Sequence, residues 1–242
     1  MLEIRHNKMD NVTATQEAYN LIYQKEGIRQ RDSFYLWILS LLKPDPTSLL
    51  LDISCGQGRL VTLAQSRDVH AIGLDFALEG VLSGKFDSPQ SKWLVGDGEK
   101  LPFVNNSIDY VTHIGSLEHY LDPLKGAEEI SRVLKPGGKA AILLPNAFGL
   151  MGNIKHVMTT GEIFDDGQPI QRYGTRSTWE NILIRAGLKV VKTIAYGEVE
   201  LPRTYQEAIW FISHPRKVLR YIVSFLIPLN LSNHFVFVCT CD

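Results

Sequence analysis

The sequence predicts an α/β fold with a doubly wound, mostly parallel sheet. From residue 48 onward, short β-branched or Leu-rich runs alternate with stretches of helical length, which is typical of βαβ units. The first of these runs leads into a glycine-rich turn that opens a helix. At 242 residues the chain has a length that one α/β domain commonly reaches. We therefore expect a single domain over residues 1–242.

Two helices are expected before the first strand. Residues 13–25 place apolar side chains at helical spacing, and a second helix is expected to be capped by Asp32 and to end before Pro44. The segments 146–173 and 197–233 are expected to be the least regular. The expected strands are 48–53, 69–74, 92–95, 108–114, 139–144, 188–195 and 235–239. The expected helices between them are 58–65, 77–84, 124–134 and 177–186, the last capped by Ser177.

Composition and charge exclude several classes of protein. With 45% hydrophobic and 21% charged residues the chain is expected to be globular, and its net charge of −1 gives no field that would attract nucleic acid. Residues 1–12 lack the apolar core of a signal peptide, and no apolar run reaches the ~18 residues that span a bilayer. We therefore expect a cytoplasmic protein without a nucleic-acid partner or a transmembrane segment. The sequence leaves the oligomeric state open.

The cysteines predict neither a disulfide framework nor a metal centre. Cys55, Cys239 and Cys241 are too few and too unevenly placed for disulfide bonds. Cys239 and Cys241 lack partner ligands, and no His or Cys pair has the spacing of a zinc site. We therefore expect no metal.

The glycine-rich turn has the sequence Asp52-Ile53-Ser54-Cys55-Gly56-Gln57-Gly58. Turns of this kind lie at the carboxyl edge of a doubly wound sheet, where ligands bind. A dinucleotide site needs G-x-G-x-x-G, but the position of its last glycine holds Val61 or Arg59, depending on the register. The G-x-x-x-x-G-K-[ST] phosphate loop is also missing. The turn is therefore expected to bind a nucleoside-like ligand that has no pyrophosphate.

Three acidic positions lie at or just after the ends of the first three strands of the expected sheet. Asp52 is suited to an ammonium group, or it hydrogen-bonds the N–H groups of its own turn. Asp75 lies 23 residues later, close to the ~20-residue offset at which a carboxylate meets ribose hydroxyls, or it caps the next helix. Asp97-Gly98-Glu99 could accept a hydrogen bond from an adenine amine, although taken alone it reads as a turn.

These pieces, in this order and spacing, resemble the class I methyltransferases that depend on S-adenosyl-L-methionine (SAM). The D-x-G-x-G-x-G motif of that family is similar to residues 52–58, with Ser54 in place of the first glycine. Residues 97–103, D-G-E-K-L-P-F, resemble the D-A-E-x-L-P-F stretch of its ubiquinone-biosynthesis-like branch, with Gly98 in the alanine place. Residues 108–119 follow the family's F-D-x-V to L-E-H pattern, and residues 132–138 form its R-V-L-K-P-G-G turn.

The resemblance implies a Rossmann-like sheet of seven strands, with the last strand antiparallel. It also implies SAM as cofactor and S-adenosyl-L-homocysteine (SAH) as product, with Asp75 on the ribose and Phe76 against the adenine. The domain would divide into an N-terminal helical cover (1–47), a cofactor-binding core (48–146) and an acceptor-side lid (147–175 and 198–233). The residues expected to bind the cofactor are Asp52, Ser54, Cys55, Gly56, Gly58, Asp75, Phe76, Asp97, Gly98, Glu99, Gly115 and Ser116.

Methyl transfer from a sulfonium mainly requires alignment of the reactants and exclusion of water. His119 is the candidate general base, since a pKa near ~6.5 suits proton transfer at neutral pH. Its place in the family pattern also fits a structural or cofactor-shell role. The residues expected near the acceptor are His156, Arg172 and Tyr173, and those expected to close the SAM pocket, with an arginine on the methionine carboxylate, are Tyr19, Tyr23, Arg29 and Arg31.

A small-molecule acceptor is expected. Residues 216–231 are unusually apolar, which predicts either a lid helix packed on the domain or an apolar gate for a hydrophobic or lipid-linked acceptor, with Lys217 and Arg220 near a membrane surface. Two other classes share parts of the pattern. A non-catalytic SAM-binding protein would share every cofactor motif, whereas a nucleotide-cofactor oxidoreductase would share the sheet but needs the missing glycine pattern.

Overall fold

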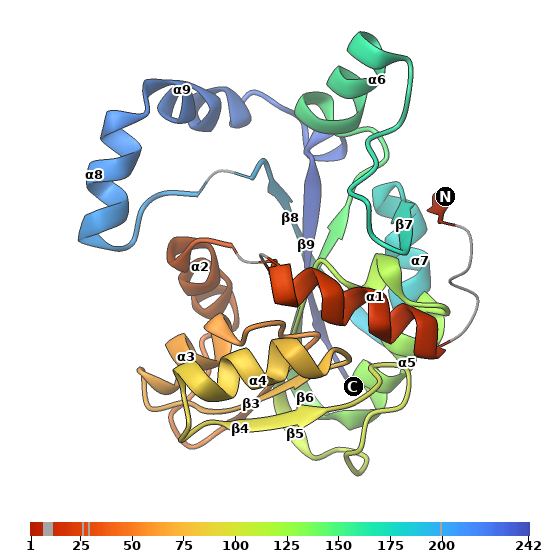
Figure 1. Cartoon of the computed structure of the whole chain (residues 1–242), viewed down its shortest axis with the longest axis vertical. Helices are drawn as coiled ribbons and strands as arrows, with labels where there is room; N and C mark the ends of the chain where they lie inside the picture. The colour runs from red at the N-terminus through yellow and green to blue at the C-terminus, as the bar shows by residue number, and fades with distance from the viewer. Residues whose placement is uncertain (7–11, 26, 29, 199) are drawn as a thin grey trace.

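The computed structural model describes residues 1–6, 12–25, 27–28, 30–198 and 200–242 (Figure 1). Its main sheet consists of β2 (Leu49–Ile53), β3 (His70–Asp75), β4 (Lys92–Val95), β5 (Ile108–Ile114), β6 (Leu134–Pro145), β8 (Lys189–Tyr196) and β9 (His234–Thr240). The strand order is β4-β3-β2-β5-β6-β9-β8. In this order, each pair of neighbouring strands from β4 through β3, β2 and β5 to β6 is parallel, whereas β9 is antiparallel to both of its neighbours, β6 and β8. The predicted fold class, with its antiparallel last strand, is confirmed.

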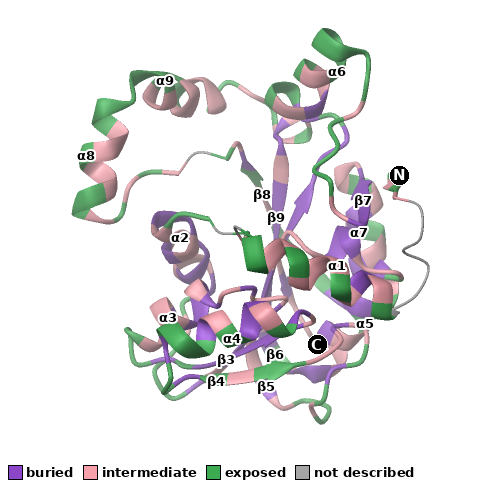
Figure 2. Cartoon of the chain, viewed as in Figure 1, coloured by how far each residue is buried: buried purple, intermediate pink, exposed green. Residues whose placement is uncertain are grey.

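Helices cover both faces of this sheet. The helices of the core are α1 (Val12–Lys25), α2 (Asp32–Leu42), α3 (Arg59–Gln65), α4 (Leu78–Asp87), α5 (Pro123–Val133) and α7 (Arg176–Arg185). Alternate strand residues point to opposite faces. Leu51 and Phe237 pack with α5 and α7 in one core, whereas Leu50 and Val236 pack with α2 and α3 in the other. The central strands are therefore buried on both sides (Figure 2), which explains their continuous apolar runs.

Two predictions of helix caps are wrong. Arg31, not Asp32, occupies the N-cap position of α2, and no side chain caps that end. Asp32 lies in the first turn, where a carboxylate suits the helix dipole, and accepts a hydrogen bond of 2.7 Å from Nε of Arg59. Helix α7 begins one residue before the predicted cap Ser177, because the Thr175 hydroxyl accepts from the amide of Thr178.

The segment expected to be loose after β6 is ordered. It contains a π-helical turn η2 (Leu150–Ile154), helix α6 (Lys155–Thr160) and strand β7 (Ile170–Tyr173). Strand β7 pairs antiparallel with β1 (Leu2–Arg5) in a separate two-stranded sheet. The sequence pattern predicts neither strand, because four residues are too few for an alternation of apolar and polar side chains to stand out.

The segment expected to be least regular contains helices α8 (Tyr205–Ser213) and α9 (Pro215–Ser224), which extend away from the sheet (Figure 1). None of their residues is buried, so the expectation of a lid helix packed on the domain is wrong (Figure 2). Leu219 and Ile222 on α9 are more than half exposed. Among the described residues, no helix combines the length and the apolar character needed to cross a membrane.

Candidate functional site

One cavity of about 830 Å³ lies at the carboxyl ends of the parallel strands. Its volume is in the range of small-molecule sites. All but one of the residues predicted to bind a cofactor line it, and so does the predicted base. These are Asp52, Ser54, Cys55, Gly56, Asp75, Phe76, Asp97, Gly98, Glu99, Gly115, Ser116 and His119.

Asp75 organises the glycine-rich turn. Its carboxylate accepts hydrogen bonds of 2.7 Å from the amide of Gly56 and 2.8 Å from the amide of Ala77. The alternative that Asp75 caps the next helix is not borne out, because the N-cap of α4 is Ala77 and no side chain caps that end. The carboxylate keeps lone pairs for other donors. Gly56 has φ +53°, and a Cβ there would lie 2.9 Å from the Tyr23 hydroxyl. Glycine thus keeps the cavity floor open.

Asp52 lies beside Asp75 on the neighbouring strand. Its carboxylate accepts a hydrogen bond of 2.6 Å from the Thr112 hydroxyl. Burial raises the pKa of Asp52 to about 7 and the pKa of Asp75 to about 6. Two buried carboxylates at one cavity favour a ligand that brings positive charge or several hydrogen-bond donors.

Gly58 is the predicted cofactor residue that does not line the cavity. It occupies the N-cap position of α3 with φ +69°, and a Cβ there would overlap the indole ring of Trp93. That ring also lies against Gly73 and Gly84. The glycine is therefore required for packing beneath the turn and not for contact with a ligand.

Ser54, which replaces a family glycine, keeps the glycine conformation at φ +56°. Its hydroxyl lies 2.9 Å from the Tyr120 hydroxyl, which in turn lies 2.9 Å from Nε2 of His113. A left-handed backbone is unfavourable for serine by about 1 kcal/mol, and this hydrogen-bonded chain offsets the cost. A Cβ at Gly98 would overlap the same tyrosine hydroxyl.

The Asp97-Gly98-Glu99 turn is held by its own carboxylates. Asp97 accepts from the amide of Glu99 at 2.8 Å, and Glu99 accepts from the amide of Asp122 at 3.0 Å. Both residues still line the cavity. Residues 97–99 therefore form a turn, as one of the two interpretations predicted, and this is compatible with a contact to a ligand.

His119 presents one ring nitrogen to the cavity. Its Nδ1 donates to the carbonyl of Ile170, so the lone pair is on Nε2 when the ring is neutral. Burial lowers the pKa of His119, which keeps the ring neutral. Nε2 lies 3.9 Å from Oε1 of Glu118 and 4.0 Å from Oδ2 of Asp166. Burial and the nearby Asp166 raise the pKa of Glu118 to about 8, and a positive charge on the His119 ring would favour the ionised form of Glu118. This geometry suits a proton acceptor whose charged form would be stabilised by Asp166 and by ionised Glu118.

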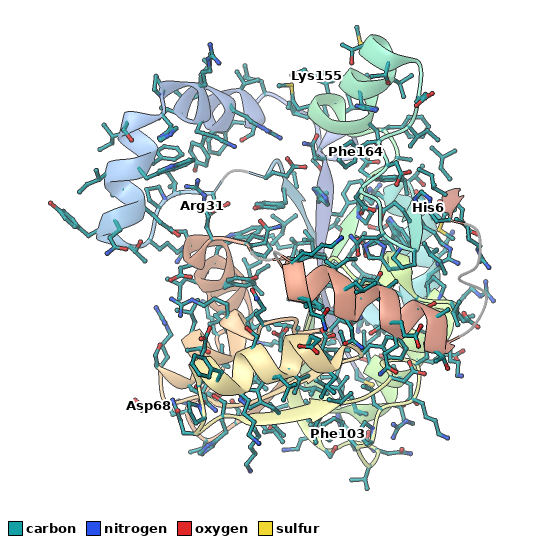
Figure 3. All side chains as sticks on the ribbon, viewed as in Figure 1. His6, Arg31, Asp68, Phe103, Lys155 and Phe164 are labelled. Atoms are coloured by element: carbon teal, nitrogen blue, oxygen red, sulfur yellow. The ribbon has the colours of Figure 1, made fainter. Side chains whose placement is uncertain are left out.

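The N-terminal candidates separate into two groups. Tyr19 and Tyr23, on α1, line the cavity, and Gln16 holds that helix by donating 2.7 Å to the carbonyl of Phe76. Arg31 does not line the cavity, because its guanidinium stacks 3.0 Å from the ring centroid of Trp210 on α8 (Figure 3). Arg29 lies outside the described residues.

Of the three residues predicted to lie near the acceptor, two line the cavity and one does not. His156 and Tyr173 line the cavity, on the side where Lys155 and Phe164 are labelled in Figure 3. Arg172 does not, because its guanidinium donates to the carbonyls of Glu118, Tyr120 and Leu121 and pairs with Glu3. It braces the 3₁₀ turn η1 (Leu117–His119), which carries the candidate base.

Sequence reasoning missed several residues of the cavity wall. Glu118, Tyr120, Asp166 and Gln171 all line it. Glu118 belongs to the L-E-H pattern already recognised and could have been proposed from it. Gln171 carried no signal, because it reaches the cavity only through the unexpected pairing of β7 with β1.

Residues 51–142 match the family model of the methyltransferase domain. An uncharacterized methyltransferase of Mycobacterium tuberculosis is 28% identical over 144 residues, which are 59% of this chain and 58% of that protein. A demethylmenaquinone methyltransferase of Renibacterium salmoninarum is 34% identical over 97 residues, which are 40% of this chain and 41% of the relative. The match thus spans 58% or less of the length of these curated relatives.

The comparison with solved structures extends beyond the matched segment. An S-adenosylmethionine dependent methyltransferase from Mesorhizobium loti is similar over 86% of this chain and 97% of its own, with a TM-score of 0.64. The identity is 13%, so this similarity shows the fold alone. Residues 51–142 are therefore similar to a methyltransferase domain, and the chain as a whole has a Rossmann-like α/β fold.

Proposed function

We propose that the protein transfers a methyl group from SAM to a small-molecule acceptor. The observation that carries the proposal is the pair of buried carboxylates, Asp52 and Asp75, at adjacent strand ends beside the Gly56 turn. The turn lacks the glycine pattern of a dinucleotide site, which disfavours an oxidoreductase. The lone pair on Nε2 of His119 supports a catalyst over a non-catalytic SAM-binding protein, because it could accept a proton from a bound acceptor.

The residues of the cavity fit SAM. Asp52 would hold the ammonium group and Asp75 the ribose hydroxyls, while Gly56 provides a cradle that a Cβ would fill. Phe76 would lie against the adenine. When bound, SAM supplies an electrophilic methyl group on a sulfonium, and the electron pair of the broken carbon–sulfur bond stays on sulfur. The chain aligns the acceptor and excludes water, and His119 takes the acceptor's proton.

The proposal includes a division of the domain. Residues 1–47 would cover the cavity, residues 48–146 would bind the cofactor, and residues 147–175 and 198–233 would enclose the acceptor. Lining residues from each part support this division, namely Tyr19, Asp75, His156 and Asn233. The motif at residues 97–103 supports a place in the ubiquinone-biosynthesis-like branch.

Calorimetric titration tests the proposed cofactor. SAM is expected to bind and NADH is not, and SAM affinity is expected to rise about tenfold or more from about pH 5 to about pH 8. The sign follows from burial, which leaves Asp52 and Asp75 largely protonated below their pKa values of about 7 and 6. Their ionised forms bind the ammonium and the diol, so binding releases protons until both are ionised. Titrations in two buffers of different ionisation enthalpy count those protons. Well-folded protein that does not bind SAM would contradict the proposal.

We further propose that the acceptor has an apolar part that enters from a lipid surface. The arm of α8 and α9 supports this, because Ile212, Leu219 and Ile222 are all more than half exposed. Arg216 and Lys217 flank them on α9 and suit anionic headgroups. Arg220, from the same helix, lines the cavity and pairs with Glu198 at 2.8 Å. The arm thus adjoins the cavity mouth.

Vesicle sedimentation tests this arm. Wild-type protein is expected to bind phosphatidylglycerol vesicles more than phosphatidylcholine vesicles. Replacing Leu219 and Ile222 by Asp should lower the bound fraction about fivefold or more, since each loses apolar burial and adds repulsion. Phe86→Asp is the matched control, because Phe86 on α4 is 86% exposed and lies outside the cavity lining. If Phe86→Asp lowers the bound fraction as much as the double variant does, the arm is not the membrane contact. The same holds if the wild-type protein is a dimer and the double variant is a monomer, because the exposed apolar face would then be a contact between two copies of the chain.

A further inference from the structure

We propose that the methyl acceptor is an amine, whose nitrogen binds between Glu118, Gln171 and His119 at the inner wall of the cavity. This assignment rests on the proposed function and deepens it by naming the class of acceptor. Glu118 and His119 belong to η1, and Gln171 comes from β7, so the site is assembled from segments far apart in the chain.

Two buried side-chain oxygens that line the cavity have no hydrogen-bond donor among the described residues. Among the residues that the structure describes, Oε2 of Glu118 and Oε1 of Gln171 have no hydrogen-bond partner. The two residues are only 4% and 3% exposed, and both line the cavity. A buried acceptor left unpaired costs about 1–3 kcal/mol. Both atoms call for hydrogen-bond donors, and an ammonium group carries several.

The charges around these atoms favour a cation over an anion. Glu118 and Asp166 each lie within 4.0 Å of the His119 ring. The nearby cation Arg172 is occupied by three backbone carbonyls and by Glu3. In the described part of the chain, no group of three His, Cys, Asp or Glu residues could hold a metal ion. Burial raises the pKa of Glu118 to about 8, so a cation bound beside it would favour its ionised form, whereas an anion would be drawn to the part of the cavity lined by Lys155. An organic cation is therefore the ligand that fits between Glu118, Gln171 and His119.

The same charges favour nitrogen over oxygen as the reacting atom. A hydroxyl acceptor would develop negative charge beside two carboxylates when it loses its proton, which is unfavourable. An ammonium acceptor instead loses a proton to Nε2 of His119 and becomes a neutral amine with a free lone pair. The positive charge moves to the imidazole, where Glu118 and Asp166 stabilise it. The imidazolium then returns the proton to solvent.

The test is a set of calorimetric titrations of the full chain saturated with SAH, using n-hexylamine, 1-hexanol and hexanoate. Hexylamine is expected to bind about tenfold or more tightly than hexanol, and hexanoate more weakly than both. Glu118→Gln should lower hexylamine affinity about tenfold and leave hexanol affinity within about twofold. Glu128→Gln, an exposed change of the same kind on α5 outside the cavity lining, should change neither. If Glu118→Gln does not fold, Gln171→Leu provides the same comparison, because it removes the other unpaired oxygen.

The outcomes separate this inference from the proposed function. If SAH binds but hexylamine binds no better than hexanol, the amine assignment is overturned and the cofactor proposal stands. If Glu118→Gln weakens SAH as much as hexylamine, Glu118 holds the ammonium group of the cofactor, and the assignment is again overturned. If SAH does not bind at all, the proposed function fails and the inference fails with it.

Discussion

Replacing Asp75 by asparagine is expected to weaken SAM binding about 100-fold or more, or about 2.7 kcal/mol. The carboxylate already accepts from the amides of Gly56 and Ala77, and its remaining lone pairs would accept from the ribose hydroxyls. Asparagine replaces one carboxylate oxygen by an NH₂ group, which cannot accept a hydrogen bond from any of these donors. Hydrogen bonds to a charged acceptor contribute about 1.5–3 kcal/mol each, so losing one and removing the charge that strengthens the other produces an effect of this size.

The measurement is calorimetric titration with SAM, together with a thermal melt to show that the variant is folded. Asp87→Asn is the matched control, because Asp87 lies at the exposed end of α4, outside the cavity lining. It is expected to bind SAM as the wild-type protein does. A folded Asp75→Asn variant with unchanged affinity would remove Asp75 from the site and, with it, the main support for SAM as the ligand.

Gly58→Ala is expected to destabilise the protein by about 3 kcal/mol, lowering its melting temperature by about 6–12 °C. Two effects add. The residue has φ +69°, which disfavours alanine by about 1 kcal/mol. The new Cβ would also overlap the Trp93 ring, which lies against the backbone of Gly73 and Gly84 so closely that a Cβ at either position would overlap it too.

A double-mutant cycle separates the two effects. Trp93→Leu removes the ring that meets the new Cβ, so Gly58→Ala should cost about 1 kcal/mol in that background instead of about 3 kcal/mol. Thermal and chemical denaturation of the four proteins give the coupling energy. An unchanged cost in the Trp93→Leu background would show that backbone strain alone makes glycine necessary here.

The part of the site built on parallel strands was predictable from the sequence. Asp75 ends β3, and Asp52 is the next-to-last residue of the neighbouring strand β2. The carboxyl ends of adjacent parallel strands necessarily meet at one edge. Strands β4 and β5 have the predicted bounds, because their apolar runs are flanked by turn residues. Local pattern and topology agree in this half of the molecule, so local reasoning was sufficient.

The acceptor side was less predictable because it depends on contacts between distant residues. Arg172 was expected near the acceptor, but pairing of β1 with β7 brings Glu3 to it and turns its guanidinium toward backbone carbonyls. The same pairing brings Gln171 to the cavity. The prediction that the segment around α9 packs on the domain was wrong for a different reason. The amphipathic pattern of α9 shows that an apolar face exists, but not whether the domain covers that face.

The contact between Gly98 and Tyr120 restricts the order in which substitutions can accumulate. The related branch has alanine at the position of Gly98, and here an alanine Cβ would overlap the tyrosine hydroxyl. Alanine at position 98 therefore requires Tyr120 to move or to be replaced by a smaller residue. Such a replacement would remove the partner of Ser54, leaving serine in a glycine conformation without its hydrogen bond. Residues 54, 98 and 120 are therefore coupled, and the effect of substituting one of them should depend on which residues stand at the other two positions.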